Sequence, residues 1–248
     1  MTDHPKKTPS AISYFADNPI STASEDLLQR SKFVERIVRE IDMIDASQGY
    51  VMAVMGQWGS GKTSVLNLVK ERLSNSGPML VEYNPWLLSG VEELVDGLFR
   101  EINAKLNKKG VKYRAAIDKI IDYGEMLTPL TSVPVVGAWA NGVLTPFQVM
   151  AKHRNLRTTS VVEQKEQVAE ALTNIDSPIV VIVDDIDRLD RAEVREIFKL
   201  VRLTANFPNV IYLLSFDRIR VENALAEDGV PGRAYLEKIV QNGFEIPL

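Results

Sequence analysis

Residues 56–63 read Gly-Gln-Trp-Gly-Ser-Gly-Lys-Thr, between an apolar run at 50–55 and a helical pattern from Ser64 to Leu73. This is a complete G-x-x-x-x-G-K-[ST] motif in the strand–loop–helix context that it requires. Its glycines let the backbone turn tightly and approach a ligand that a Cβ would obstruct. The amides at the start of the following helix form a concave site for an anion. The chain is therefore expected to fold as an α/β protein around a phosphate-binding loop.

The side chains of this loop have separate expected tasks. Lys62 is expected to reach the β- and γ-phosphates of a nucleoside triphosphate, and the Thr63 hydroxyl to ligate Mg²⁺. Trp58 has no phosphate chemistry, so packing against a neighbouring loop near Trp86 is favoured over nucleotide contact. The loop as a whole is expected to bind the nucleotide through Gly56, Gln57, Trp58, Gly59, Ser60, Gly61, Lys62, Thr63 and Ser64.

The composition excludes several other kinds of site. The chain of 248 residues has no cysteine, which excludes a disulfide framework, thiolate zinc sites and a cysteine nucleophile. Its two histidines, His4 and His153, leave little for a multi-histidine metal site or a serine-histidine-aspartate triad. The net charge of -4 disfavours a broadly basic nucleic-acid surface. Residues 1–16 read as a flexible polar leader without a signal peptide, so a cytoplasmic protein is expected, with membrane association left open.

Strands and helices alternate along the chain. This alternation predicts a three-layer sandwich around a mostly parallel sheet of about five strands. The resemblance of the phosphate loop to P-loop ATPases implies the strand order 5-1-4-3-2, with the strand 210–215 between 50–55 and 179–183. The expected strands are 50–55, 79–83, 179–183, 210–215 and 244–246. The expected helices are about 24–44, 64–73, 91–106, 107–124, 161–175, 191–204, 218–226 and 234–241.

Two adjacent carboxylates, Asp184 and Asp185, follow the most apolar strand of the chain. Ligands bind at the carboxyl ends of parallel strands, where the phosphate loop also lies. Asp184 is expected to hold Mg²⁺ through its water shell, and Asp185 to orient or deprotonate the attacking water. The alternative is a charged turn in which Asp187 or Asp190 caps the next helix.

Further features favour ATP as the nucleotide. The strand 79–83 lies between the strands of the two motifs along the chain, as in the ATPase branch of P-loop proteins, and Asn107-Lys108-Lys109-Gly110 lacks the aspartate of the guanine-reading N-K-x-D signature. Ser215 or Asp217 is placed to sense the γ-phosphate, while Asp217 could equally cap the next helix. Phosphoryl transfer needs a cation opposite the γ-phosphate. The unranked candidates are Arg188, Arg191, Arg202, Arg218 and Arg233.

Four segments together resemble the KAP family of P-loop NTPases, which belongs to or lies beside the STAND class of signal-transduction ATPases. They are residues 57–64, 84–86, 183–188 and 235–247. The resemblance implies one KAP-type domain at 17–248 with an insertion at about 107–160, and a C-terminal lid or effector outside this chain. It also implies that Asp184 and Asp185 are the Walker B pair. By the same resemblance, residues 17–20 with Leu28 and Arg30 form a wall around adenine, so Ile20 and Arg30 join the nucleotide-binding residues.

Residues 126–150 contain no charged residue. Prolines and glycines interrupt the stretch, and it is long enough for one membrane crossing at most. Because the two motifs share one sheet, the chain would need an even number of crossings, so no transmembrane span is expected. A core-covering loop, a membrane-surface element and an apolar patch remain. Between the last two, a patch for a homo-oligomer or a partner protein is favoured.

These observations lead to a Mg-dependent, ATP-binding and ATP-hydrolysing switch. Members of the resembled family couple ATP to signalling or scaffolding, and several bacterial ones resemble phage-exclusion or defence proteins. A non-hydrolysing ATP-gated scaffold is the alternative. A small-molecule kinase lacks an acceptor signature, and the acidic balance disfavours a nucleic-acid motor.

Overall fold

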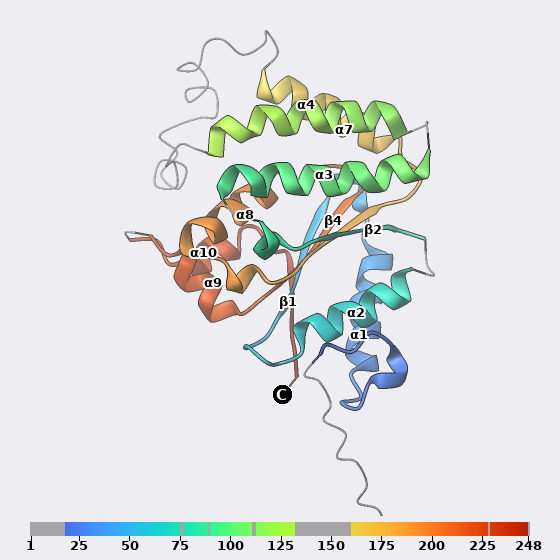
Figure 1. The fold of residues 1–248 in the computed structure, drawn as a ribbon, viewed down its shortest axis with the longest axis vertical. Helices are drawn as coiled ribbons and strands as arrows, with labels where there is room; N and C mark the ends of the chain where they lie inside the picture. Colours follow the sequence, from blue (N-terminus) through green and yellow to red (C-terminus); the bar gives the residue numbers. More distant parts are fainter. Residues whose placement is uncertain are drawn as a thin grey trace, which may run out of the picture.

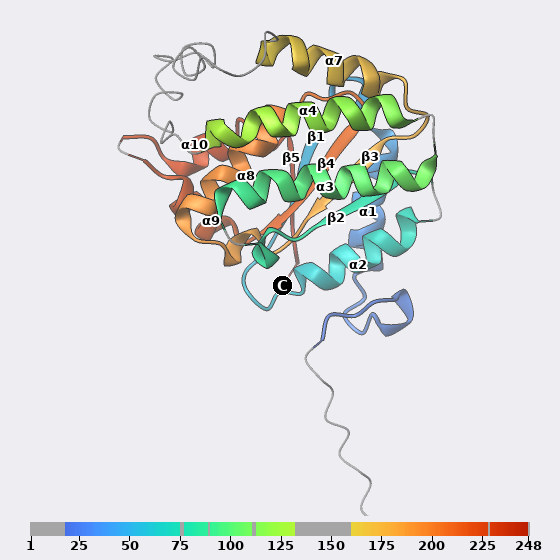
Figure 2. The ribbon, with the colours of Figure 1, turned by 45° about the horizontal axis from the view of Figure 1, so that its top comes forward.

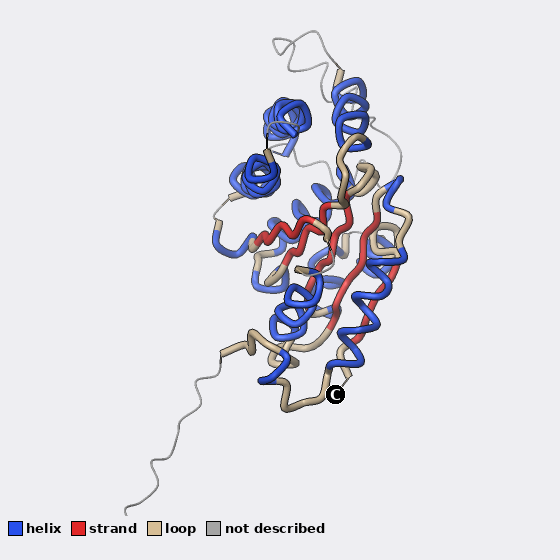
Figure 3. Tube along the Cα trace, turned by 90° about the vertical axis from the view of Figure 1, so that its right-hand side faces the viewer, coloured by secondary structure: helices blue, strands red, loops and turns tan. Residues whose placement is uncertain are grey.

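The computed structural model describes residues 18–74, 77–88, 90–110, 113–131, 160–227 and 229–247. They form an α/β sandwich in which helices cover both faces of one sheet (Figures 1 and 3). The strands are β1 (Tyr50–Met55), β2 (Met79–Tyr83), β3 (Ile179–Val183), β4 (Val210–Phe216) and β5 (Asn242–Glu245). The helices are α1 (Ser31–Met43), α2 (Lys62–Leu73), α3 (Val91–Lys109), α4 (Arg114–Thr131), α7 (Val161–Thr173), α8 (Arg191–Thr204), α9 (Arg218–Leu225) and α10 (Gly232–Leu236). Short 3₁₀ turns are η1 (Ala23–Glu25), η2 (Ala46–Gln48), η3 (Pro85–Leu87) and η5 (Ile186–Arg188).

All pairings in the sheet are parallel. The strand order is β2-β3-β4-β1-β5, which is the predicted order read from the opposite edge. Every residue of β3 and β4 is buried, as expected for apolar strands covered on both faces. Because β4 lies between β1 and β3, the carboxyl ends of all three meet at the same edge of the sheet.

Two hydrophobic clusters form on opposite faces of the sheet. Alternate residues of each strand point to opposite faces, so each strand contributes to both clusters. Helices α1 and α2 cover one face, packing against residues such as Met52 and Ile182. Helices α3, α8, α9 and α10 contribute to the other cluster, and α4 packs between α3 and α7 as an outer layer (Figure 2). The phosphate loop opens on the α2 side.

The first helix begins later than predicted. It was expected from about Ser24, but α1 begins at Ser31, where the Asp26 carboxylate accepts hydrogen bonds from the Ser31 amide and hydroxyl. Gln29 just before it has a φ of 52°, which a continuous helix cannot contain. Leu27 and Leu28 consequently lie outside the core, with 91% and 71% exposure.

The last helix and strand also differ from prediction. The helix expected over 234–241 corresponds to α10, which ends at Leu236, and β5 begins at Asn242 rather than Phe244. Gln241 explains the early end of the helix. Its backbone amide donates to the Val51 carbonyl, and its side-chain oxygen accepts from the Val51 amide. Gln241 therefore pairs with Val51 near the start of β1 instead of continuing a helix.

The predicted helix over 107–124 is divided between two elements. Helix α3 continues to Lys109, and α4 starts at Arg114. The start of the uncharged stretch belongs to α4, where Leu127 is buried in the core. Residues 132–150 lie outside the described part, as do residues 1–17, so the leader and the bounds of the insertion stay predictions. Among the described helices, none is both long and apolar enough to cross a membrane.

Candidate functional site

The loop between β1 and α2 curves around a cavity of about 270 Å³ at the carboxyl edge of the sheet. Gly59 and Gly61 have φ angles of 78° and 83°, a left-handed conformation that glycine adopts without cost. Gly61 is also the N-cap of α2, so the first turn of that helix points its free amides at the cavity. The cavity is lined by Asn18, Pro19, Trp58, Gly59, Gly61, Lys62, Thr63, Ser64, Asp185, Asp187 and Arg188.

Lys62 is held at the floor of this loop. Its ammonium group donates to the carbonyls of Gly56 and Gln57, over 3.1 and 3.4 Å, and lies 3.5 Å from the carboxylate of Asp187. Asp187 is almost fully buried, so this acid neutralises Lys62 inside the site. The alternative of a helix cap belongs to Asp190, which forms a capping box with Glu193 at the start of α8. Residues 184–190 therefore contain both a helix cap and carboxylates directed at the phosphate loop.

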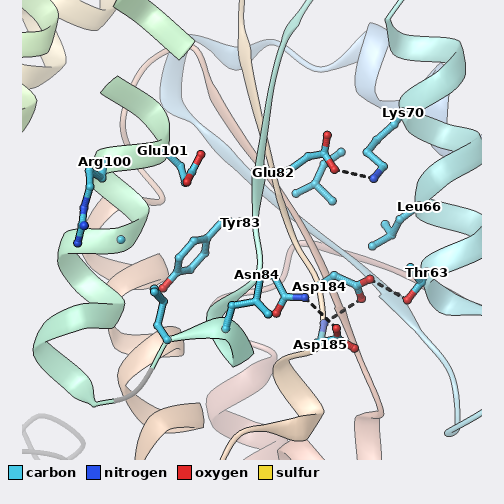
Figure 4. Close-up of a pocket in the computed structure, with 14 residues that line it drawn as sticks. Thr63, Leu66, Lys70, Glu82, Tyr83, Asn84, Arg100, Glu101, Asp184 and Asp185 are labelled. Carbon is cyan, nitrogen blue, oxygen red and sulfur yellow. Dashed lines mark hydrogen bonds and ion pairs between the residues drawn. The ribbon is translucent and has the colours of Figure 1, made fainter. Parts of the chain in front are cut away.

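Thr63 and Asp184 meet at the junction of α2 and β3 (Figure 4). The Thr63 hydroxyl donates to one Asp184 oxygen over 2.8 Å, and the other oxygen accepts from the Asp185 amide over 2.9 Å. A hydroxyl and a carboxylate side by side next to a phosphate site fit Mg²⁺. This ion is usually bound through one or two protein oxygens together with phosphates and water.

Asp185 is held in place by three local constraints. Its φ is 60°, an uncommon left-handed value for a residue with a side chain. One carboxylate oxygen accepts a 2.9 Å hydrogen bond from the Asn84 amide group, and the other lies 2.7 Å from Arg188 Nε. Burial raises the pKa of Asp185 above its usual value, against the opposing effects of the Asn84 hydrogen bond and the Arg188 charge. Asp184 and Asp187 raise it further.

Trp58 and Trp86 lie on either side of Arg188. The guanidinium carbon of Arg188 is 5.0 Å from the ring centroid of each tryptophan, within the range of cation–π attraction. Both rings are exposed, Trp58 to 63%. The predicted proximity of Trp58 to Trp86 is therefore mediated by an arginine between them.

The residues assigned to the adenine wall lie beside the loop. The Ile20 amide donates to the Ser64 hydroxyl over 3.3 Å, and its carbonyl accepts from the Asn67 side chain over 2.8 Å. The Arg30 guanidinium donates to the Ser60 carbonyl. Leu28 is exposed and does not line the cavity, and Asp17 lies outside the described residues. Contact of Ile20 and Arg30 with adenine stays a prediction.

The two candidate sensors at the end of β4 have different surroundings. The Asp217 side chain accepts from the Arg220 amide over 3.2 Å and so caps α9. Ser215 is fully buried opposite Val54 of β1, and its hydroxyl has no partner among the described residues. The capping interpretation of Asp217 is thus confirmed, and a polar sensor at Ser215 stays a prediction.

Sequence reasoning missed two contacts in this site. Asn84 was noted only as part of the Asn84-Pro85-Trp86 string, yet it connects the end of β2 to Asp185. Asp187 was considered only as a cap, yet it pairs with Lys62. The one available signal was that both residues stand just beyond strands expected to end at this edge.

A second, larger cavity of about 470 Å³ lies beside the first, between α2, the β2 edge and α3 (Figure 4). Its charged groups are largely paired: Lys70 with Glu82 over 2.7 Å, and Arg100 with Asp96. Thr63 and Asp185 line both cavities, whereas Asp184 lines only the larger one. The remaining lining residues are Leu66, Tyr83, Asn84, Leu87, Leu88, Gly97, Glu101 and Ile182.

Comparison with known proteins gives one family and one curated relative. A profile described as "KAP family P-loop domain" matches residues 30–248. The phage T7 exclusion protein of Escherichia coli K12 is 28% identical over 259 aligned residues, covering 93% of this chain but only 34% of that protein.

Two solved structures are similar to this chain at low identity. Cdc6p from Pyrobaculum aerophilum has 14% identity and a TM-score of 0.45, covering 90% of this chain and 46% of its own. A Walker-type ATPase from Pyrococcus abyssi has 13% identity and a TM-score of 0.45, and the match covers 92% of this chain and 56% of the ATPase.

Proposed function

The chain belongs to the KAP family of P-loop domains, and on that premise we propose that it is a Mg-dependent switch that binds and hydrolyses ATP. The observation that carries the proposal is the 2.8 Å contact between the Thr63 hydroxyl and Asp184. It brings the two oxygen groups suited to Mg²⁺ together at the mouth of the phosphate loop. ATP is preferred to GTP because the sequence lacks a guanine-reading signature.

Binding of the triphosphate is assigned to the loop and to Lys62. The loop amides and the α2 N-terminus would take phosphate oxygens. Lys62 would exchange its contacts with the Gly56 and Gln57 carbonyls for the β- and γ-phosphates. Thr63 and Asp184 would hold Mg²⁺, which neutralises phosphate charge when it is bound.

Hydrolysis is assigned to Asp185. The Asp185 carboxylate would orient a water molecule and take its proton as the water oxygen forms a bond to the γ-phosphorus. The bond from the γ-phosphorus to the bridging oxygen breaks, and ADP leaves with that electron pair. A carboxylate whose pKa is raised by burial is a better proton acceptor than an ordinary aspartate.

The output of the switch is proposed by analogy with the relative. Because the T7 exclusion protein has a matching segment, we place this chain in a phage-defence type of signalling system. The response would pass to a second copy or a partner protein, with residues 126–150 as the proposed contact. The proposed location is the cytoplasm. The competing function is a scaffold in which ATP locks one conformation without turnover.

Two measurements test the proposal. Purified chain is titrated with ATP and with GTP, each with Mg²⁺ and with EDTA, and phosphate release is followed over many turnovers. Mg-dependent preference for ATP with repeated turnover is expected. Tight ATP binding without any phosphate release, even at concentrations where the chain assembles, would favour the scaffold. Absence of triphosphate binding would contradict both functions.

A further inference from the structure

Arg188 stands out among the candidate cations because of where its guanidinium group lies. Arg188 and Lys62 are the cations that line the cavity of the phosphate loop, as far as the described residues show. Lys62 already has a task at the β- and γ-phosphates. Arg188 therefore occupies the position from which a second positive charge can reach the end of a bound triphosphate.

The other candidate arginines interact with partners outside the cavity. Arg191 donates to the Asn223 carbonyl, and Arg218 pairs with Glu222 and Glu245. Arg233 pairs with Glu237 at the end of α10, and the charge of Arg202 acts on Tyr235, whose pKa it lowers against the larger effect of burial. None of these four lines the cavity.

The surroundings of Arg188 hold the guanidinium without using all of its donors. The two tryptophan rings engage its carbon at 5.0 Å each, and Nε meets the Asp185 carboxylate over 2.7 Å. A guanidinium carries five N–H donors. No contact within the described part of the chain takes up the two terminal nitrogens, so the group is positioned with donors to spare for phosphate oxygens.

The same arrangement restrains Asp185. Both of its carboxylate oxygens already accept a contact, one from Asn84 and the other from Arg188. Asn84 and Trp86 belong to one short segment at the end of β2, since the Asn84 side chain also caps η3 by accepting from the Trp86 amide over 3.1 Å. One segment thus holds the carboxylate through Asn84 and the arginine through Trp86.

We propose that Arg188 is the arginine that contacts the terminal phosphate of bound ATP, and that its move to the phosphate frees Asp185 to act on water. The inference rests on the proposed hydrolysis of ATP and adds the residue that links triphosphate arrival to catalysis. A γ-phosphate in the cavity competes with Asp185 for the guanidinium, because both are anions and the phosphate carries more charge. With ADP, which lacks that group, Arg188 stays on Asp185.

The kinetic test compares Arg188→Ala and Arg188→Lys with Arg233→Ala, an exposed paired arginine, as the matched control. Arg188→Ala is expected to bind Mg·ATP within a few-fold of wild type and to lose about 10³-fold or more in kcat. Aluminium fluoride mimics the transferred phosphoryl group and is expected to raise the affinity of the wild-type chain for ADP. Arg188→Ala is expected to lose this increase in ADP affinity. Lysine is not expected to restore turnover, because it lacks the planar fork of donors. Full turnover in Arg188→Ala would overturn the inference, as would equal loss of ADP and ATP binding, which indicates a structural role.

A second readout does not depend on turnover. The chain has three tryptophans, and replacing Trp139, which lies outside the described residues, by Phe leaves Trp58 and Trp86 as reporters. In that background a non-hydrolysable ATP analogue is expected to change the tryptophan fluorescence more than ADP does, because Arg188 leaves the two rings. Arg188→Ala should abolish this difference. An unchanged difference would overturn the inference even if the wild-type chain hydrolyses ATP. A wild-type chain that binds no triphosphate would overturn the proposed function itself, and this inference with it.

Discussion

Thr63 and Asp184 are 121 positions apart in the chain and are joined by a 2.8 Å hydrogen bond at the edge of the sheet. Thr63 is the second residue of α2, the helix after β1, and Asp184 directly follows β3, with β4 between these strands. The bond therefore depends on the parallel alignment of three strands, which brings their carboxyl ends together. It marks the place where we expect Mg²⁺ and the phosphates to bind.

Replacing Lys62 by Ala is expected to abolish tight triphosphate binding. The ammonium group is the only charge that the loop itself offers to the β- and γ-phosphates, and its removal also leaves Asp187 buried without its partner. Titration calorimetry with Mg·ATP measures the loss. Lys70→Ala on the same helix is the control, because Lys70 pairs with Glu82 away from the loop. Unchanged affinity in Lys62→Ala would contradict the assignment of the loop.

Replacing Asp185 by Asn is expected to preserve ATP binding and to reduce turnover by at least about 10²-fold, because the amide cannot accept a proton. Rapid quench of a single turnover, together with retention of bound ATP on a desalting column, measures both properties. Asp190→Asn is the matched control, since asparagine caps a helix as well as aspartate does. Normal turnover in Asp185→Asn would remove Asp185 from the role of base.

The acid limb of kcat/KM is expected to report Asp185. The base acts only when deprotonated, so the rate should fall as the pH drops through its pKa. Because burial raises that pKa, the fall should begin at a higher pH than for an ordinary aspartate, whose pKa is about 3.9. A pH profile of kcat/KM is the measurement, since this parameter reports the free enzyme. A rate that stays level down to pH values where an ordinary aspartate is protonated would disagree with a base of this kind.

Asn84→Ala is expected to move that acid limb further upward. The hydrogen bond from Asn84 lowers the pKa of Asp185, so removing it favours the protonated form. Asn174→Ala is the control, because the Asn174 side chain donates to the Glu170 carbonyl at the exposed end of α7, away from the site. Asn84→Ala also removes the cap of η3, and thermal unfolding of both variants measures how much stability that loss costs. A profile identical to wild type would mean that Asn84 does not influence the base.

Gly49→Ala is expected to destabilise the fold more than Gly229→Ala. Both glycines have positive φ, 70° and 82°, so an alanine at either site adds about 1–2 kcal/mol of backbone strain. At Gly49 a Cβ would also lie 2.1 Å from the Ala205 carbonyl oxygen, whereas at Gly229 no atom of the described residues lies within 4 Å. Thermal unfolding should show a clearly larger decrease in Tm for Gly49→Ala. Equal decreases would mean that the backbone next to β1 can move aside.

Much of the framework could be predicted because its signals are local. The apolar runs of β3 and β4 and the glycine pattern of residues 56–63 each report on a short stretch of chain. The alternation of strands and helices predicted the parallel sheet, and the resemblance to P-loop ATPases gave the order of its strands. Predictions failed where a distant residue set the boundary of an element. The example is Val51, which pairs with Gln241 across 190 positions of the chain and shortens α10.

The site divides in the same way. The sequence by itself determined which residues form the phosphate loop and that two carboxylates follow a buried strand, because both are runs of adjacent residues in a recognisable order. Only the tertiary structure decided which groups meet: Asn84 with Asp185, Asp187 with Lys62, and Arg188 between Trp58 and Trp86. These contacts join the ends of different elements, and side-chain distances there depend on how β1, β2 and β3 align in the sheet. The local sequence does not specify that alignment. The five candidate arginines for the cation opposite the γ-phosphate could therefore not be ranked until the fold placed one of them at the cavity.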